Sequence, residues 1–142
     1  MSRSRVPAAL RRLVRERAAG ACEYCRTPEW ISVASFHVDH IVATKHGGGT
    51  EAGNLAFACP LCNAHKGTDL TTHDPTSGEA VSIFHPSTHR WADHFRVVAG
   101  RIEARSAIGD ATVRLLQLNA PTRIEERQRW RKLQSGVGRG QM

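Results

Sequence analysis

The sequence has no long apolar run and no apolar leader at its amino terminus. None of its 142 residues belongs to a stretch approaching the ~20 apolar residues that span a bilayer. Arginines stand near the amino terminus, where a signal peptide would have its apolar segment. We therefore expect a soluble, cytoplasmic protein and not a membrane-spanning or exported one.

Acidic residues are also few compared with basic ones. Twenty Lys and Arg against 13 Asp and Glu give a formal net charge of +7. Such a charge attracts polyanions, because binding releases counterions from their phosphates. Arginines gather in residues 3–17 and again in residues 123–139. Nucleic acid is the expected partner, although an Arg-rich composition alone would also make the chain basic.

The length fits one compact domain, since domains commonly run to about 100–150 residues. Apolar spacing, caps and turn residues predict helices over 7–19, 60–66, 110–118 and 122–133, strands over 31–38, 55–58 and 80–84, a hairpin over 95–104 and a flexible loop over 44–53. We predict a single α+β domain over residues 1–134, with its core at 20–68, an extension at 69–134 and a disordered tail at 135–142.

The chain has four cysteines, and they form two matched Cys-x-x-Cys pairs. The residues are Cys22, Cys25, Cys59 and Cys62. Two such pairs supply the four thiolates of a tetrahedral zinc site. Disulfides are disfavoured in a reducing compartment, and buried small side chains would not come as two matched pairs. Because no coordination position stays open, we predict a structural zinc that also anchors the short helix over 60–66.

The segment around these pairs carries a second pattern. His37-Val38-Asp39-His40 is followed by a glycine-rich loop, then by Gly53-Asn54-Leu55, and Asn63-Ala64-His65-Lys66-Gly67 follows the second cysteine pair. On these motifs residues 22–67 resemble the HNH endonuclease family. The resemblance implies a ββα-metal core, in which two strands and one helix enclose the active site, with flanking helices and a small additional β region around it. It also implies a metal-dependent DNA endonuclease.

The chemistry of phosphodiester hydrolysis agrees with these residues. The reaction needs a water activated near neutral pH, where imidazoles titrate, so a positioned histidine is a suitable general base. General base catalysis supplies only about 10²–10⁴ in rate, so a metal ion must stabilise the developing charge. His40 resembles the family's base, Asp39 its metal ligand, and Asn54 the residue that orients the loop by hydrogen bonds.

The third family position is often histidine, but this chain has Asn63. An amide oxygen suits Mg²⁺ or Mn²⁺, which prefer hard ligands. His65 is the alternative ligand, although two residues along a helix place it about 200° around from Asn63. His37 shares a strand face with Asp39, so it is either a further ligand or a histidine that merely packs.

Several basic residues are candidates for DNA contacts. Lys66 follows Asn63 by three residues, so it either meets a phosphate or is a solvated lysine at a helix end. We expect Arg11, Arg12 and Arg15 to bind the phosphate backbone of double-stranded DNA, and such contacts position the DNA without selecting a sequence.

The sequence leaves open whether the protein forms a homodimer that cuts both strands. It also leaves open the biological role, from restriction, defence and homing to repair and packaging. A zinc-stapled module that binds nucleic acid without cutting is the alternative function, and a redox switch built on the cysteines is a third.

Overall fold

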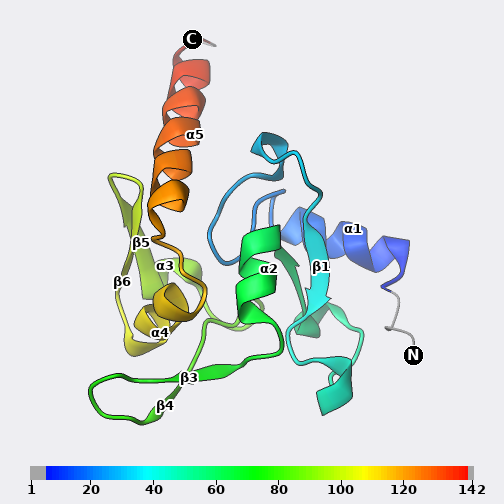
Figure 1. The fold of residues 1–142 in the computed structure, drawn as a ribbon. Helices are drawn as coiled ribbons and strands as arrows, with labels where there is room; N and C mark the ends of the chain where they lie inside the picture. Colours follow the sequence, from blue (N-terminus) through cyan, green and yellow to red (C-terminus); the bar gives the residue numbers. More distant parts are fainter. Residues whose placement is uncertain (1–5, 141–142) are drawn as a thin grey trace.

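The structure is a computed structural model that describes residues 6–140, with only the backbone described from residue 135. Its helices and strands (Figure 1) are α1 (Ala8–Arg17), β1 (His37–His40), β2 (Leu55–Ala58), α2 (Pro60–Lys66), β3 (Thr71–His73), β4 (Ala80–Ser82), α3 (Trp91–His94), β5 (Phe95–Val98), β6 (Arg101–Ala104), α4 (Ala107–Leu115) and α5 (Pro121–Gly140). Short 3-10 helices are η1 (Glu29–Ile31), η2 (Thr44–His46) and η3 (Ala52–Asn54). The predicted α+β class is confirmed.

The centre of the fold is a hairpin followed by a short helix. Strands β1 and β2 pair antiparallel, from His37 opposite Ala58 to His40 opposite Leu55, and α2 packs beside them (Figure 1). All four residues of β2 are buried. Pro60 stands at the first position of α2, where a missing N–H costs nothing, and Gly67 ends it. This is the ββα unit that the family resemblance implied, and the bounds predicted for β2 and α2 are confirmed.

The strand predicted over residues 31–38 is wrong over most of its length. Residue 31 ends η1, and β1 begins only at His37. The intervening backbone bonds to nearby side chains instead of to a neighbouring strand. Ser32 Oγ both accepts from Ala34 N and donates to Ala34 O, while Phe36 N donates to Glu29 Oε2. Such local bonds compete with a strand ladder and favour a turn.

The extension is built from two further hairpins and α4. Strands β3 and β4 form one hairpin, and β5 and β6 form the other. The hairpin predicted over 95–104 is confirmed, and it turns at Ala99 and Gly100, which have positive φ values of 52° and 82°. The helix predicted over 110–118 begins earlier, at Ala107, because Ser106 Oγ accepts from Gly109 N at 2.9 Å and caps it, so Asp110 lies inside α4.

Helix α5 is longer than predicted. It projects away from the rest of the fold (Figure 1) and continues past residue 133 to Gly140. Its helical backbone therefore enters the stretch predicted as a disordered tail, of which residues 141–142 lie outside the described part of the chain. Among the described helices, none combines the length and apolarity needed to cross a bilayer. The predicted domain boundaries remain predictions.

One buried cluster connects the ββα unit with the extension. It includes Val14 of α1, Leu55 of β2, Ile102 of β6 and Leu116 after α4, all fully buried, together with the four cysteines. The cysteines therefore lie where the two parts of the chain pack together.

Candidate metal centre and catalytic groove

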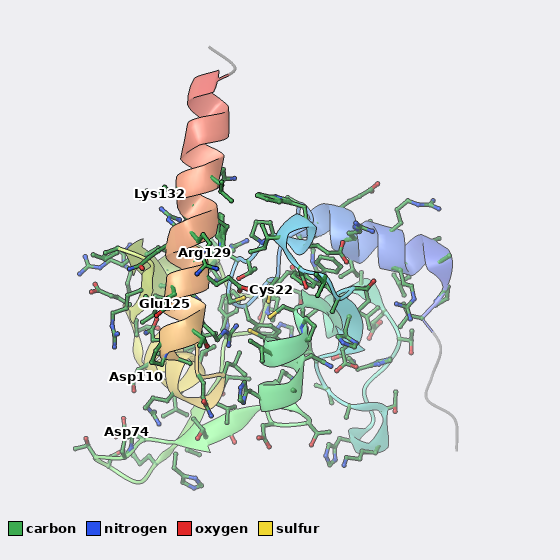
Figure 2. All side chains as sticks on the ribbon, turned by 45° about the horizontal axis from the view of Figure 1, so that its top comes forward. Cys22, Asp74, Asp110, Glu125, Arg129 and Lys132 are labelled. Carbon is green, nitrogen blue, oxygen red and sulfur yellow. The ribbon has the colours of Figure 1, made fainter. Side chains whose placement is uncertain are left out.

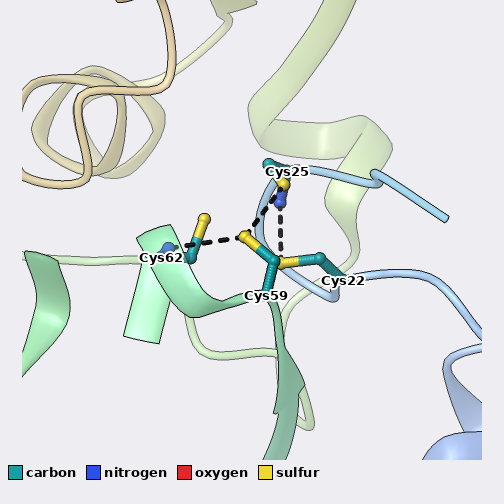
Figure 3. Close-up of side chains that lie close together, drawn as sticks. All are labelled: Cys22, Cys25, Cys59 and Cys62. Atoms are coloured by element: carbon teal, nitrogen blue, oxygen red, sulfur yellow. Dashed lines mark hydrogen bonds between the residues drawn. The ribbon is translucent and has the colours of Figure 1, made fainter. Parts of the chain in front are cut away.

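The four cysteines converge from two segments of the chain. Cys22 and Cys25 come from the turn after α1, whereas Cys59 and Cys62 come from the end of β2 and the first turn of α2 (Figure 3). All four are buried, and their Sγ atoms lie within 4.8 Å of one another. In each pair the second backbone N–H donates to the first Sγ at 3.4 Å. This geometry favours negative charge on the sulfurs.

The spacing of the sulfurs fits a tetrahedral metal. With metal–sulfur bonds of about 2.3 Å, the edge of a thiolate tetrahedron is about 3.8 Å, and the Cys25 and Cys59 Sγ atoms are 3.7 Å apart. Across the described residues, this is the only group of three or more His, Cys, Asp or Glu side chains placed to hold a metal. The four cysteines predicted as ligands are therefore arranged for one metal ion.

The thiols of the cluster affect one another's protonation. Burial raises the pKa of Cys22 and of Cys62, since a thiolate is poorly solvated there. Hydrogen bonds with Cys22 lower the pKa of Cys25 and of Cys59. Without a metal the cluster must therefore retain protons, whereas a bound divalent cation would stabilise all four thiolates and leave part of their negative charge for a nearby cation to offset.

Arg123 of α5 supplies a cation beside the sulfurs. Its Nη2 donates to Cys62 Sγ at 3.1 Å and lies 3.8 Å from Cys59 Sγ, while Nη1 donates to Leu116 O at 2.8 Å. The residue is only 6% exposed. Burial opposes its charge, but the charges of Cys62 and Cys25 outweigh burial and raise its pKa. Sequence reasoning missed Arg123, because 61 residues separate it from Cys62 and no spacing rule connects them.

A groove along β1 brings together most of the residues predicted to be catalytic or to bind the catalytic metal. It has a volume of about 520 Å³. Its lining residues are Val6, Arg11, Phe36, His37, Val38, Asp39, His40, Ala43, Thr44, Asn63, Gly67 and Thr68. Regular strand alternation would turn Asp39 and His40 to opposite faces. Both nevertheless line one groove, because the groove extends along the whole of β1 and past its last residue, His40, to Ala43 and Thr44.

Two loop residues set the surroundings of His40. Its Nε2 is 2.9 Å from Thr50 Oγ1. Asn54 is 8% exposed, and its side chain ties the two sides of the loop together: Oδ1 accepts from Val42 N at 2.9 Å, and Nδ2 donates to Val42 O at 3.0 Å and to Gly49 O at 2.8 Å. These bonds fix the loop that carries Thr50.

Glycine is required in this loop for a steric reason. A Cβ atom added at Gly48 would lie 1.8 Å from Val42 O and 2.7 Å from Asn54 Nδ2. The loop predicted to be flexible is therefore packed closely against Asn54 at this point, and η2 and η3 form within it.

Lys66 is buried, so the alternative of a solvated lysine at the helix end is wrong. It is 5% exposed, and Nζ donates to Ile41 O at 2.9 Å, which connects α2 to the residue after β1. Burial lowers its pKa. Since Nζ already has a carbonyl partner, a DNA contact would require the side chain to leave this position.

Apart from His37 and His40, the histidines do not line the groove. His65 is half-buried on α2 and does not line the groove, whereas Asn63 does. His85, His89 and His94 gather around the ring of Phe84 or beside it. The histidine that joins His40 and Asp39 in the groove is His37, and it is exposed.

The predicted DNA-binding arginines are exposed on α1. Arg11 lines the groove, and Arg15 pairs with Glu29 at 2.6 Å yet remains 61% exposed. Arg17 on the same helix differs: it donates to both carboxylate oxygens of Glu23 at 2.7 and 3.0 Å. Glu23 in turn accepts from Phe57 N, so Arg17 stabilises the fold.

Comparison with known proteins supports the resemblance. Residues 22–69 match the family model HNH endonuclease, which confirms the resemblance drawn for residues 22–67. The four cysteines inside this segment fit the zinc-binding subgroup of that family. No curated protein and no solved structure matches the chain.

Proposed function

We propose that this protein is a metal-dependent endonuclease that hydrolyses phosphodiester bonds of DNA. The observation that carries the proposal is the groove, which gathers His40, Asp39 and Asn63 within the segment matched to the HNH family and places Arg11 at its edge. A module that only binds nucleic acid has no need of an Asp-His pair in a groove. Double-stranded DNA is the expected substrate, and a homodimer remains open.

His40 acts as the general base in this proposal. In the proposed tautomer its Nε2 carries the proton and donates to Thr50 Oγ1, 2.9 Å away, a bond that holds the ring. Among the described side chains none forms a hydrogen bond with Nδ1 of His40. Nδ1 therefore accepts the proton of a water molecule that attacks the phosphorus. Asn54 maintains this geometry through the loop and forms no bond with the reacting atoms.

Asp39 and Asn63 would hold Mg²⁺ or Mn²⁺ in the groove, with His37 as a further ligand and His65 a less suitable one. When bound, such an ion stabilises the charge that develops on the phosphate and on the leaving oxygen. Two protein oxygens are a fitting number for Mg²⁺, which commonly keeps several waters and is completed by substrate phosphates. The exposed position of Asp39 leaves room for both.

The metal of the cysteine cluster is a structural Zn²⁺. Four buried thiolates leave no coordination position for water or substrate. The ion would connect the turn after α1 to α2. In α2 the ligand Cys62 is followed directly by Asn63, which lines the groove. We place the protein in the cytoplasm, where reducing conditions keep the four cysteines available as ligands.

The test is nicking of supercoiled plasmid with Mg²⁺ or Mn²⁺ by wild type, His40→Ala and His46→Ala. Loss of the base should lower the rate by about 10²–10⁴, while metal content and circular dichroism stay unchanged. His46 is the matched control, since it is exposed in the same loop and does not line the groove. Equal cleavage by His40→Ala would contradict the mechanism. DNA binding without cleavage across several divalent ions would favour the binding module.

A further inference from the structure

Two more hollows connect to the catalytic groove along α1. The first, of about 340 Å³, shares Arg11, Phe36 and Val38 with the groove. The second, of about 510 Å³, shares Arg15 and Glu29 with the first. Three neighbouring hollows therefore follow one another from the groove that His40 lines, past the arginines of α1, to a place between η1 and α5, and together we call them the depression. We call the last of them the Trp30 hollow, after its exposed tryptophan.

This depression is strongly positive. The two hollows beyond the groove are lined by four arginines, Arg11, Arg12, Arg15 and Arg26, and by one glutamate, Glu29. Glu29 pairs with Arg15, but the arginine side chain stays 61% exposed. Exposed guanidinium groups in a row fit the repeating phosphates of a nucleic-acid strand.

The Trp30 hollow adds an aromatic surface to this charge. Trp30 is 64% exposed, an unusual position for the largest apolar side chain. Trp130 of α5 lines the same hollow and is 7% exposed, and its indole N–H has no hydrogen-bond partner among the described residues. Proteins that bind single strands combine such positive grooves with aromatic side chains on which bases stack. Inside a duplex the base faces are covered by their neighbours, so away from a duplex end a base can stack on Trp30 only if it is unpaired.

We propose that a DNA strand leaving the groove follows Arg11, Arg12 and Arg15 to the Trp30 hollow, where the indole of Trp30 stacks on an unpaired base. This inference rests on the proposed nuclease function and narrows its substrate class. The preferred DNA has a single-stranded segment beside the cleaved bond, such as an overhang, a flap or a branch. The arginines contact the phosphates of single-stranded and double-stranded DNA alike, and Trp30 distinguishes single-stranded from double-stranded DNA.

The experiment measures binding in the His40→Ala background, so that cleavage does not interfere. Fluorescent oligonucleotides are a blunt duplex and the same duplex with a single-stranded extension. We expect the extended DNA to bind about fivefold tighter or more and to quench tryptophan fluorescence. Trp30→Ala should remove this preference and the quenching while leaving blunt-duplex binding unchanged. Trp30→Phe should restore most of the preference, because a phenyl ring also stacks.

Val33→Ala is the matched control, since Val33 is fully exposed nearby and lines none of the three hollows. The inference is overturned if Trp30→Ala retains the preference for the extended DNA, or if the substitution weakens the binding of both DNAs equally. An unchanged response to both DNAs would point to a protein partner at Trp30. Failure of the nuclease proposal is distinguishable: wild type would then cut neither DNA, whatever the binding preference.

Discussion

The cysteine cluster and the groove proposed as the active site both take residues from α2, yet only the cluster has a complete set of metal ligands from the protein. The cluster brings four buried ligands within 4.8 Å of one another and adds a buried guanidinium. In the groove, Asp39 and His37 are exposed, and the proposed base His40 forms a hydrogen bond with Thr50. A metal in the cluster would need no further ligand, whereas the metal proposed for the groove would depend on water and substrate to complete its coordination.

The cluster and the groove are connected through two consecutive residues of α2. Cys62 is a ligand of the cluster, and its neighbour Asn63 lines the groove. A helix of two turns is marginal on its own, so the position of Asn63 depends on the anchoring of Cys62. If the comparison is right, damage to the cluster should abolish both sites, and damage to the groove should spare the cluster.

The largest effect should come from removal of the cluster metal. Structural zinc contributes about 10–16 kcal/mol of apparent binding energy coupled to folding. Cys62→Ser, or treatment of wild type with a strong chelator, should therefore cause loss of zinc, of the cooperative melting transition and of cleavage together. Metal analysis and thermal melting followed by circular dichroism measure this. A variant that loses zinc but melts and cuts as wild type would break the proposed connection.

The next effect tests whether Arg123 belongs to the cluster. Arg123→Met keeps the length of the side chain but removes the cation, which should cost about 3 kcal/mol of stability because buried negative charge is left without compensation. Zinc release to a colorimetric chelator should be faster, and urea denaturation should shift to lower concentration. Arg129→Met is the control, since Arg129 is exposed on the same helix (Figure 2). Equal behaviour of the two variants would exclude a role for the guanidinium.

A smaller effect is expected from Asn54→Ala in the groove. The substitution removes three hydrogen bonds and leaves Val42 N–H and two carbonyls unpaired, which should cost about 2 kcal/mol of stability. Cleavage should fall further than stability alone accounts for, since the loop that carries Thr50 is no longer fixed. Urea denaturation and plasmid nicking measure the two quantities. Zinc content should stay at wild-type level, and its loss would contradict the independence of the cluster.

The smallest effect should come from Thr50→Val. This variant keeps the shape of the side chain but removes the partner of His40 Nε2, so the turnover rate should fall about fivefold, as for one hydrogen bond of about 1 kcal/mol. Metal content and melting should be unchanged. Thr50→Ser, which restores the hydroxyl, should recover the rate. A Thr50→Val enzyme with wild-type turnover would show that His40 needs no such orientation.

Local signals explain which parts of this molecule were predictable. The pairs of cysteines, the buried run of β2 and the Pro60 and Gly67 boundaries of α2 lie within short stretches, and each was predicted. The beginning of β1 was not, because hydrogen bonds to Ser32 and Glu29 override the β propensity of residues 31–36. Strand β3 also escaped prediction, since its three residues carry no apolar alternation and depend on β4 for pairing.

The partners of buried charges were the least predictable features. Lys66 could be assigned to a phosphate or to solvent from its place on the helix, but its bond to Ile41 O exists only in the folded chain. Likewise, no residue near Arg123 in the sequence indicates that its guanidinium contacts a cysteine sulfur. Sequence periodicity indicates many of the apolar side chains that are buried, but only tertiary structure determines which charged side chains are buried and what they contact.

The contact of Arg123 with Cys62 also bears on how the protein can be divided. A fragment ending at residue 69 would retain every thiolate and every groove residue, yet it would lack the counter-charge that α5 brings to the sulfurs. The smallest stable unit of this nuclease candidate is therefore longer than its family motif. It has to extend at least through the first turns of α5, so truncations and fusions should be placed after that point.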